Sequence, residues 1–221
     1  MKLIVIVRFL VFTALIGTST LNVFGQSAAN EVVVTGNIGF SVFGAVLKGG
    51  LKLAERKDID TTKQQNISNV DVSSKRVRIL AVDLGLSDMW SVGLLYSNQQ
   101  FNGSFDYQYK NRQDVIIQEQ VSLTNTRSSI AFFPKIHYPI NHDRFDLYSG
   151  ARLGFVFNGL KVNTTDPNFD ILNKFVLSRP IVAVTPIGVR GYFTKNIGCN
   201  LELNIGTPNI IGFGLNVRLN N

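Results

Sequence analysis

The sequence has little of the material from which catalytic and metal sites are usually built. Its 221 residues include one cysteine and two histidines. A single cysteine cannot form an intrachain disulfide, and one cysteine with two histidines cannot complete a tetrahedral structural zinc site. The Gly-x-Ser-x-Gly pattern of a strained nucleophile turn is missing as well. We therefore expect no catalytic residues, no metal and no cofactor.

Long apolar runs are also scarce. After residue 25, no run approaches the roughly 20 apolar residues that a membrane-spanning helix needs. The mean hydropathy is +0.13, close to zero. A membrane β-barrel has such a value because lipid-facing and interior residues alternate along its strands and cancel in the average. Many soluble β proteins have it too, so composition leaves both classes open.

The first 25 residues have the organisation of a secretory signal peptide. Lys2 and Arg8 supply positive charge, residues 9–16 are apolar, and cleavage is expected near Gly25 and Gln26. A retained membrane anchor is the alternative. We predict that residues 1–25 are removed and that residues 26–221 form one domain.

The remaining chain is basic. The formal net charge is +7, and removal of Lys2 and Arg8 lowers it by two. An exported chain rarely meets nucleic acid, so we expect no nucleic-acid partner. Anionic lipid head groups are the more plausible counter-charge.

The end of the chain, residues 197–219, alternates with a period of two on either side of Thr207, Pro208 and Asn209. Period two indicates β-strands, and the proline in the break indicates a tight connection. One face of both runs is apolar. The other face holds Gly, Asn, Glu202 and Arg218. Small and polar residues suit the inside of a narrow barrel whose apolar face meets lipid. A soluble β fold is the alternative.

The same alternation predicts eight strands in all, at about residues 31–47, 76–86, 90–99, 121–140, 144–158, 176–193, 197–206 and 211–219. Long connections at about 48–75, 102–120 and 159–175 alternate with short turns at 87–89, 141–143 and 194–196. Parts of 102–120 should extend the flanking strands, and Pro134 predicts a bulge or local break. Segregated loop lengths are typical of outer-membrane barrels. We predict an all-β, eight-stranded, antiparallel, up-and-down transmembrane β-barrel.

Four aromatic residues flank the short turns on outward positions: Trp90, Tyr138, Phe145 and Phe193. Aromatic side chains gather at membrane interfaces, so these four predict a girdle on the periplasmic side. The alternative is that aromatic residues simply favour strands.

Charged residues on the opposite faces should fill the lumen, which in an eight-stranded barrel is just wide enough for side chains. The predicted lumen charges, together with His137, are Asp83, Arg127, Lys135, Arg152, Arg190, Glu202 and Arg218. Because an unpaired buried charge is costly, we expect a paired network, with Glu202 bound to Arg218 and flanked by Arg190. A small conductive or ligand-binding lumen is the alternative.

Motifs near the end of the chain resemble a known family. They are residues 186–193 (PIGVRGYF), 195–198 (KNIG) and 201–203 (LEL). The whole exported chain resembles the small OmpA/OmpX-type barrels, and these motifs resemble the Bacteroidetes-type outer membrane protein β-barrel domain family, including its PorT-like members. The resemblance implies residence in the bacterial outer membrane and insertion by the barrel insertion machinery. The chain ends Leu219-Asn220-Asn221 instead of in the usual aromatic residue.

The long loops are the remaining functional surface. We expect a structural or surface-interaction role, with outer-membrane lipid and lipopolysaccharide as neighbours. The alternatives are a component of a transport or secretion assembly, with a surface or secretion-system protein as partner, and a narrow pore. An outer-leaflet lipid enzyme is not expected, because His137 and His142 lie near a predicted periplasmic turn.

Overall fold

The computed structural model describes residues 29–41, 46, 49–50, 52, 66–110, 115–140, 144–164, 176–206 and 208–219. The predicted signal peptide and cleavage point lie outside these residues. The described residues form nine strands: β1 (Val32–Phe40), β2 (Asn66–Ser74), β3 (Val77–Gly85), β4 (Trp90–Lys110), β5 (Ile116–Tyr138), β6 (Phe145–Asn163), β7 (Val176–Tyr192), β8 (Ile197–Ile205) and β9 (Ile211–Leu219).

Eight of these strands close into a ring. The sheet runs β4-β3-β1-β9-β8-β7-β6-β5, and a further pairing of β4 with β5 joins its two ends. Every pairing is antiparallel, including the seam where β9 meets β1, with Val32 opposite Leu219. The predicted eight-stranded, antiparallel, up-and-down barrel is therefore confirmed.

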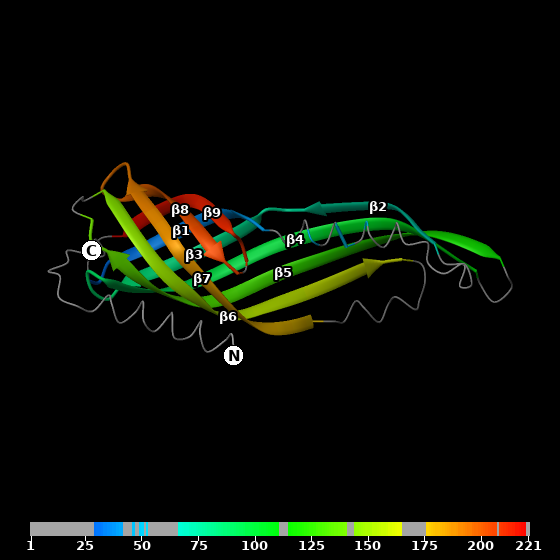
Figure 1. Cartoon of the computed structure of the whole chain (residues 1–221), viewed down its shortest axis with the longest axis horizontal. Helices are drawn as coiled ribbons and strands as arrows, with labels where there is room; N and C mark the ends of the chain where they lie inside the picture. Colours follow the sequence, from blue (N-terminus) through cyan, green and yellow to red (C-terminus); the bar gives the residue numbers. More distant parts are fainter. Residues whose placement is uncertain are drawn as a thin grey trace, which may run out of the picture.

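The barrel has two unlike ends (Figure 1). We call the end where β3 joins β4, β5 joins β6 and β7 joins β8 the short-turn end. At the other end β2 and the far halves of β4, β5 and β6 run on beyond the ring, and we call this part the extension. The ladder between β4 and β5 reaches Lys110 and Ile116, which confirms that parts of residues 102–120 extend the flanking strands.

Two predicted boundaries are wrong. The first strand ends at Phe40 instead of about residue 47, and the backbone at Val46 is helical. The predicted loop at 48–75 contains β2, which pairs with the extension of β4 and has a register shift between Ser68 and Asp71. Its many Asn, Ser and Asp residues hide it from a hydrophobicity pattern, because ladder hydrogen bonds hold it more than burial does.

Pro134 and Pro186 have different effects on the strand ladders. The predicted bulge at Pro134 is absent: the β5–β6 ladder skips Phe133 and Pro134 and resumes in the same register, so only the local break is confirmed. The ladder between β7 and β8 does have a register shift. It lies beside Pro186, between Val184 and Ile187 of β7. It leaves Pro186 and Ile187 both exposed, while Gly188 and Arg190 face inward as predicted.

Inward positions form the core of the ring. A cluster of buried side chains combines Val77, Ile79, Ala81, Leu95, Phe133 and Tyr148. The wall opposite, from β1, β9 and β8, alternates glycine with asparagine, so that Gly214 lies between Asn37 and Asn200. A Cβ atom on Gly214 would meet the Asn37 side chain and the carbonyl oxygen of Gly36. Glycine at this position is what lets the asparagine side chains lie flat against the wall.

This close approach gives a matched test. Gly214→Ala should lower the free energy of unfolding by about 1–3 kcal/mol, because the added methyl group must displace backbone or a buried amide. Gly36→Ala is the control: Gly36 faces outward with nothing within 4 Å of an added Cβ. It should be neutral or slightly stabilising, since alanine is the better strand residue. Equal denaturation midpoints for the two variants would contradict the packing described.

Candidate functional site

The lumen contains two groups of paired charges. In the first, Asp83 accepts hydrogen bonds from Lys135 (2.7 Å) and from Arg190. Arg190 also approaches Asp146, with 3.6 Å between nitrogen and oxygen. These four side chains come from β3, β5, β6 and β7 and are almost completely buried. Two cations and two carboxylates therefore neutralise each other across the ring.

The second group is centred on Glu202 of β8. One carboxylate oxygen accepts a hydrogen bond from Arg152 (2.6 Å), and the other accepts one from the Tyr148 hydroxyl (2.7 Å). Arg152 also donates to the side-chain oxygen of Asn209 (3.0 Å). Asn209 precedes β9, so this group ties β6 to the connection between β8 and β9 at the extension end.

Two aromatic rings join the groups. Lys135 and Arg190 each lie 4.8 Å from the centre of the Tyr148 ring. Lys135 and Arg152 lie 4.3 and 4.8 Å from the centre of the Phe133 ring. Cations over aromatic faces are stabilised most where water is excluded. Charges and rings together fill the middle of the lumen.

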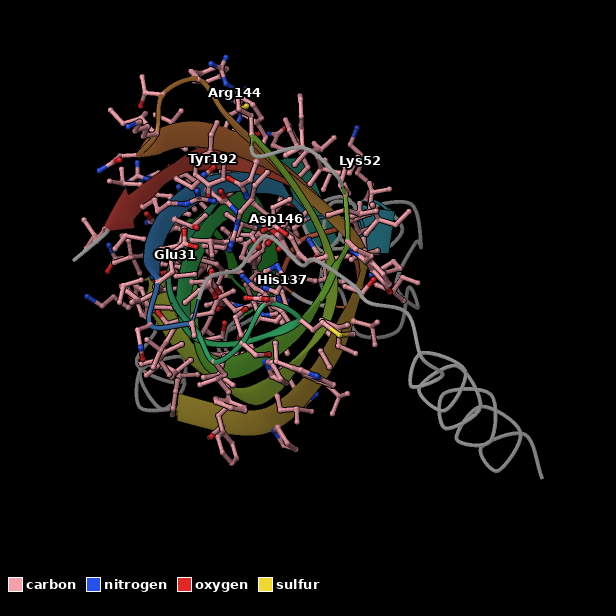
Figure 2. The ribbon with its side chains drawn as sticks, turned by 90° about the vertical axis from the view of Figure 1, so that its left-hand side faces the viewer. Glu31, Lys52, His137, Arg144, Asp146 and Tyr192 are labelled. Atoms are coloured by element: carbon pink, nitrogen blue, oxygen red, sulfur yellow. The ribbon has the colours of Figure 1, made fainter. Side chains whose placement is uncertain are left out.

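A third arrangement lies just inside the short-turn end. Ser91 Oγ is 2.7 Å from His137 Nε2, and His137 Nδ1 is 2.7 Å from Asp146 Oδ1. In the neutral imidazole, Nδ1 donates to the carboxylate and Nε2 accepts from the hydroxyl. Figure 2 looks into this end and shows His137 and Asp146 within the ring of strands. The order serine–histidine–aspartate is that of a hydrolase triad, but all three side chains are at most 3% exposed.

The predicted pairing of Glu202 with Arg218 is wrong. The β8–β9 register puts Glu202 opposite Gly212, and Arg218 lies six residues further along β9, at the short-turn end. Arg218 instead pairs with Glu31 and lies over the ring of Tyr192 at 3.9 Å. Arg190 does not flank Glu202 either, because it is held by Asp83 and Asp146.

The other predicted lumen charges lie as follows. Asp83, Lys135, Arg152, Arg190 and Glu202 meet inside the ring, as described. Arg127 lies further along β5, level with Gln99 and Asn158, and is only partly buried.

Two acidic partners, Asp146 and Glu31, are not among the predicted lumen charges. Both could have been predicted from the alternation, because each lies an even number of residues from the inward-facing residues of its own strand.

The four predicted girdle residues all lie at the short-turn end and point outward. Trp90, Tyr138, Phe145 and Phe193 are 47, 43, 47 and 66% exposed. That they mark a membrane interface stays a prediction.

In the part of the chain that the structure describes, no three or more His, Cys, Asp or Glu side chains are grouped so that they could hold a metal ion. None of the helical segments described is long and apolar enough to cross a membrane.

Comparison with known proteins gives weak similarity only. No protein-family model matches the chain, and no curated protein matches it. Among solved structures, it is similar to the N-terminal β-barrel domain of Pseudomonas aeruginosa OprF, with 10% identity, a TM-score of 0.46, and coverage of 86% of this chain and 98% of that one. It is also similar to the outer membrane protein OprG from Pseudomonas aeruginosa, with 9% identity, a TM-score of 0.46, and coverage of 90% of this chain and 100% of that one. A third similar structure is Ail of Yersinia pestis, solved with the heparin analogue sucrose octasulfate. It has 8% identity and a TM-score of 0.39, and the match covers 86% of this chain and 95% of that one. The resemblance to the Bacteroidetes-type family has no support from these comparisons and stays a prediction.

A double-mutant cycle tests the pairs in the lumen. Glu202→Ala should cost about 3–5 kcal/mol of unfolding free energy, because it leaves Arg152 buried and uncompensated. Combining it with Arg152→Met should cost clearly less than the sum of the two single changes. The matched cycle with Arg218→Met should be additive, since Arg218 lies elsewhere on β9. Coupling of Glu202 to Arg218 instead of Arg152 would show that the register is wrong.

Proposed function

We propose that the protein is an integral β-barrel of the bacterial outer membrane with a structural or surface-interaction role. The observation that carries this proposal is the distribution of apolar side chains. Around the ring, large apolar side chains cover the outward face, whereas along the extension the outward face is mainly polar and apolar side chains are buried on the inner face. A barrel that spans a bilayer and continues into water needs this reversal.

The outward face of the ring is apolar on every strand. Its most exposed large apolar side chains range from 39% exposed, at Phe157 and Val217, to 71%, at Val182. The strands β8 and β9 have nine residues each, which is close to the 9–11 that a tilted membrane strand needs. In water, an exposed apolar surface of this extent would drive aggregation. Contact with lipid explains it.

The reversal occurs at one level of the sheet. Arg78, Asn98 and Ser128 are paired across β3, β4 and β5, and all face outward. One step toward the short-turn end, the outward partners are Leu80, Tyr96 and Ile130. In the opposite direction, before the exposed Ile116 at the far end of β5, the outward side chains are polar: Asn102, Ser104, Asp106 and Gln108 on β4, and Gln120, Ser122, Thr124 and Thr126 on β5. We call this level the polar boundary and propose that it marks the outer edge of the hydrocarbon layer.

The inner face of the extension is apolar instead. Phe101, Val121 and Val162 are at most 4% exposed. From the polar boundary to Lys110, β4 would project roughly 40 Å at about 3.3 Å per residue. A layered sheet of that length, with amides and hydroxyls on its outer face, is a surface that other molecules can reach. This supports surface interaction over a purely structural role.

Two other roles stay possible for such a barrel. One is a component of an outer-membrane transport or secretion assembly with a protein partner, as the PorT-like resemblance implies. The other is a narrow pore along the wall of asparagine and glycine. The paired charges that fill the middle of the lumen oppose the pore, because ions would have to displace buried salt bridges.

We also propose that the protein is not an enzyme, although Ser91, His137 and Asp146 have the hydrogen-bond order of a triad. A nucleophile must be within reach of its substrate, and Ser91 is 2% exposed. Arg190 moreover engages the same carboxylate. We interpret the three residues as a hydrogen-bonded link that stabilises the packing of β4, β5 and β6. Labelling by a fluorophosphonate that disappears in Ser91→Ala would contradict this.

The orientation of the barrel can be measured by cysteine labelling in intact cells. In a Cys199→Ala background, Gln108→Cys in the extension should react with a membrane-impermeant maleimide. Asp88→Cys, in the turn between β3 and β4, should react only after the outer membrane is permeabilised. Both residues are polar and not buried, so reactivity reports the side of the membrane. Labelling of Asp88→Cys alone in intact cells would overturn the proposed orientation, and no association with the outer membrane would overturn the proposed function.

A further inference from the structure

Two arginines lie at the polar boundary: Arg78 is in β3, and Arg76 immediately precedes Val77, the first residue of β3. Arg78 is one of the residues that define it, and Arg76 is the next outward residue toward the extension. Both side chains are exposed. Alternate residues on a strand are about 7 Å apart, so the two guanidinium groups rise from neighbouring positions on one face.

Among the described residues, no carboxylate forms an ion pair with either arginine. Arg78 is paired with Ile38 on β1 and Asn98 on β4. Arg76 lies over the ring of Phe40, with 5.3 Å from the guanidinium carbon to the ring centre. In the described part of the chain, the arginines that pair with carboxylates lie inside the barrel, and neither Arg76 nor Arg78 is among them.

The third cation nearby is already engaged. Lys75 precedes Arg76, and its ammonium group donates a hydrogen bond to the Gln100 side chain (2.8 Å). Gln100 in turn donates to Asn102 (3.2 Å). The amides on the β4 side are therefore partly satisfied by each other and by Lys75. The two guanidinium groups keep their donors for another ligand.

Apolar side chains lie directly beside the arginines and next to them on the side of the short-turn end. Phe40, Ile38 and Leu80 are 56, 47 and 53% exposed and share the outward face of β1 and β3. A ligand that contacts both groups must carry an anionic head next to a hydrocarbon chain. A phospholipid or a phosphorylated glycolipid has this shape, whereas a free phosphate ion would leave the apolar surface uncovered.

We propose that Arg76 and Arg78 bind the phosphate of a membrane lipid in the leaflet on the extension side, with its acyl chains against Phe40, Ile38 and Leu80. Arginine suits this role because its planar fork donates two parallel hydrogen bonds to one phosphate. The site rests on the proposed membrane function, since only insertion to the polar boundary brings head groups to this level. It identifies a position on the barrel wall where lipid is held specifically.

The test measures binding of lipid A, which carries two phosphates, to the folded barrel in zwitterionic detergent by native mass spectrometry. Arg76→Gln and Arg78→Gln should each weaken binding by about tenfold, the loss expected for one charge-assisted hydrogen-bonding group. Lys161→Gln is the matched control, because it removes one positive charge from an exposed position on β6 within the extension. It should leave the affinity unchanged. Arg76→Lys should retain part of the binding, since lysine contacts phosphate as a point charge.

Several results would overturn the proposal. Equal losses from Lys161→Gln and Arg78→Gln would show attraction by net charge without a site. Full competition by millimolar inorganic phosphate would assign the site to a free ion. Heat-modifiable gel migration confirms that each variant is folded. A wild-type barrel that inserts into vesicles but does not prefer lipid A over phosphatidylcholine would overturn the lipid site and leave the membrane function standing. A failure to insert would overturn both.

Discussion

The structure depends on neutralising charge inside a narrow ring. Closing eight antiparallel strands fixes every second side chain inside, where water is scarce and an unpaired charge costs several kcal/mol. Asp83 with Lys135 and Arg190, and Glu202 with Arg152, meet this constraint by linking strands that are not neighbours in the ring. The rings of Tyr148 and Phe133 lie against the cations. The same contacts that remove the electrostatic penalty also fill the lumen, so the surfaces left for function lie outside it.

The outer surface has two regimes, which meet at Arg78, Asn98 and Ser128. On the ring, the outward face is apolar, and the inward face combines glycine, asparagine and charged side chains with one cluster of apolar side chains. On the extension, the amides and hydroxyls of β4 and β5 face outward, and Phe101 and Val121 are buried on the other side. A single pair of strands can have an apolar outer face along one part and a polar outer face along the next. Side chains alternate between the two faces whatever solvent each face meets. The proposed lipid site at Arg76 and Arg78 follows from where the reversal falls.

Period-two alternation was enough to predict the ring, its eight strands and the face of nearly every residue in it, because only one register keeps apolar residues together. It failed where that signal is missing. The strand β2 has few apolar residues and a register shift between Ser68 and Asp71, which together break its alternation, and the first strand ends at Phe40 although apolar residues continue beyond it. Partners across the lumen were out of reach for a different reason. Glu202 and Arg218 share a hairpin, but the register between β8 and β9 and the stagger of the ring decide that Arg152 and Tyr148, from a distant strand, reach Glu202 instead.

The central claim is that paired charges and aromatic rings close the lumen. Conductance of the purified barrel in a planar lipid bilayer tests this most directly, recorded once heat-modifiable migration has shown that the protein is folded. The account predicts no steady single-channel current at moderate voltage for the wild type. It also predicts that currents appear only when the network is dismantled, for example in Arg152→Ala combined with Tyr148→Ala. Steady, reproducible channels in the wild type that these substitutions leave unchanged would contradict it.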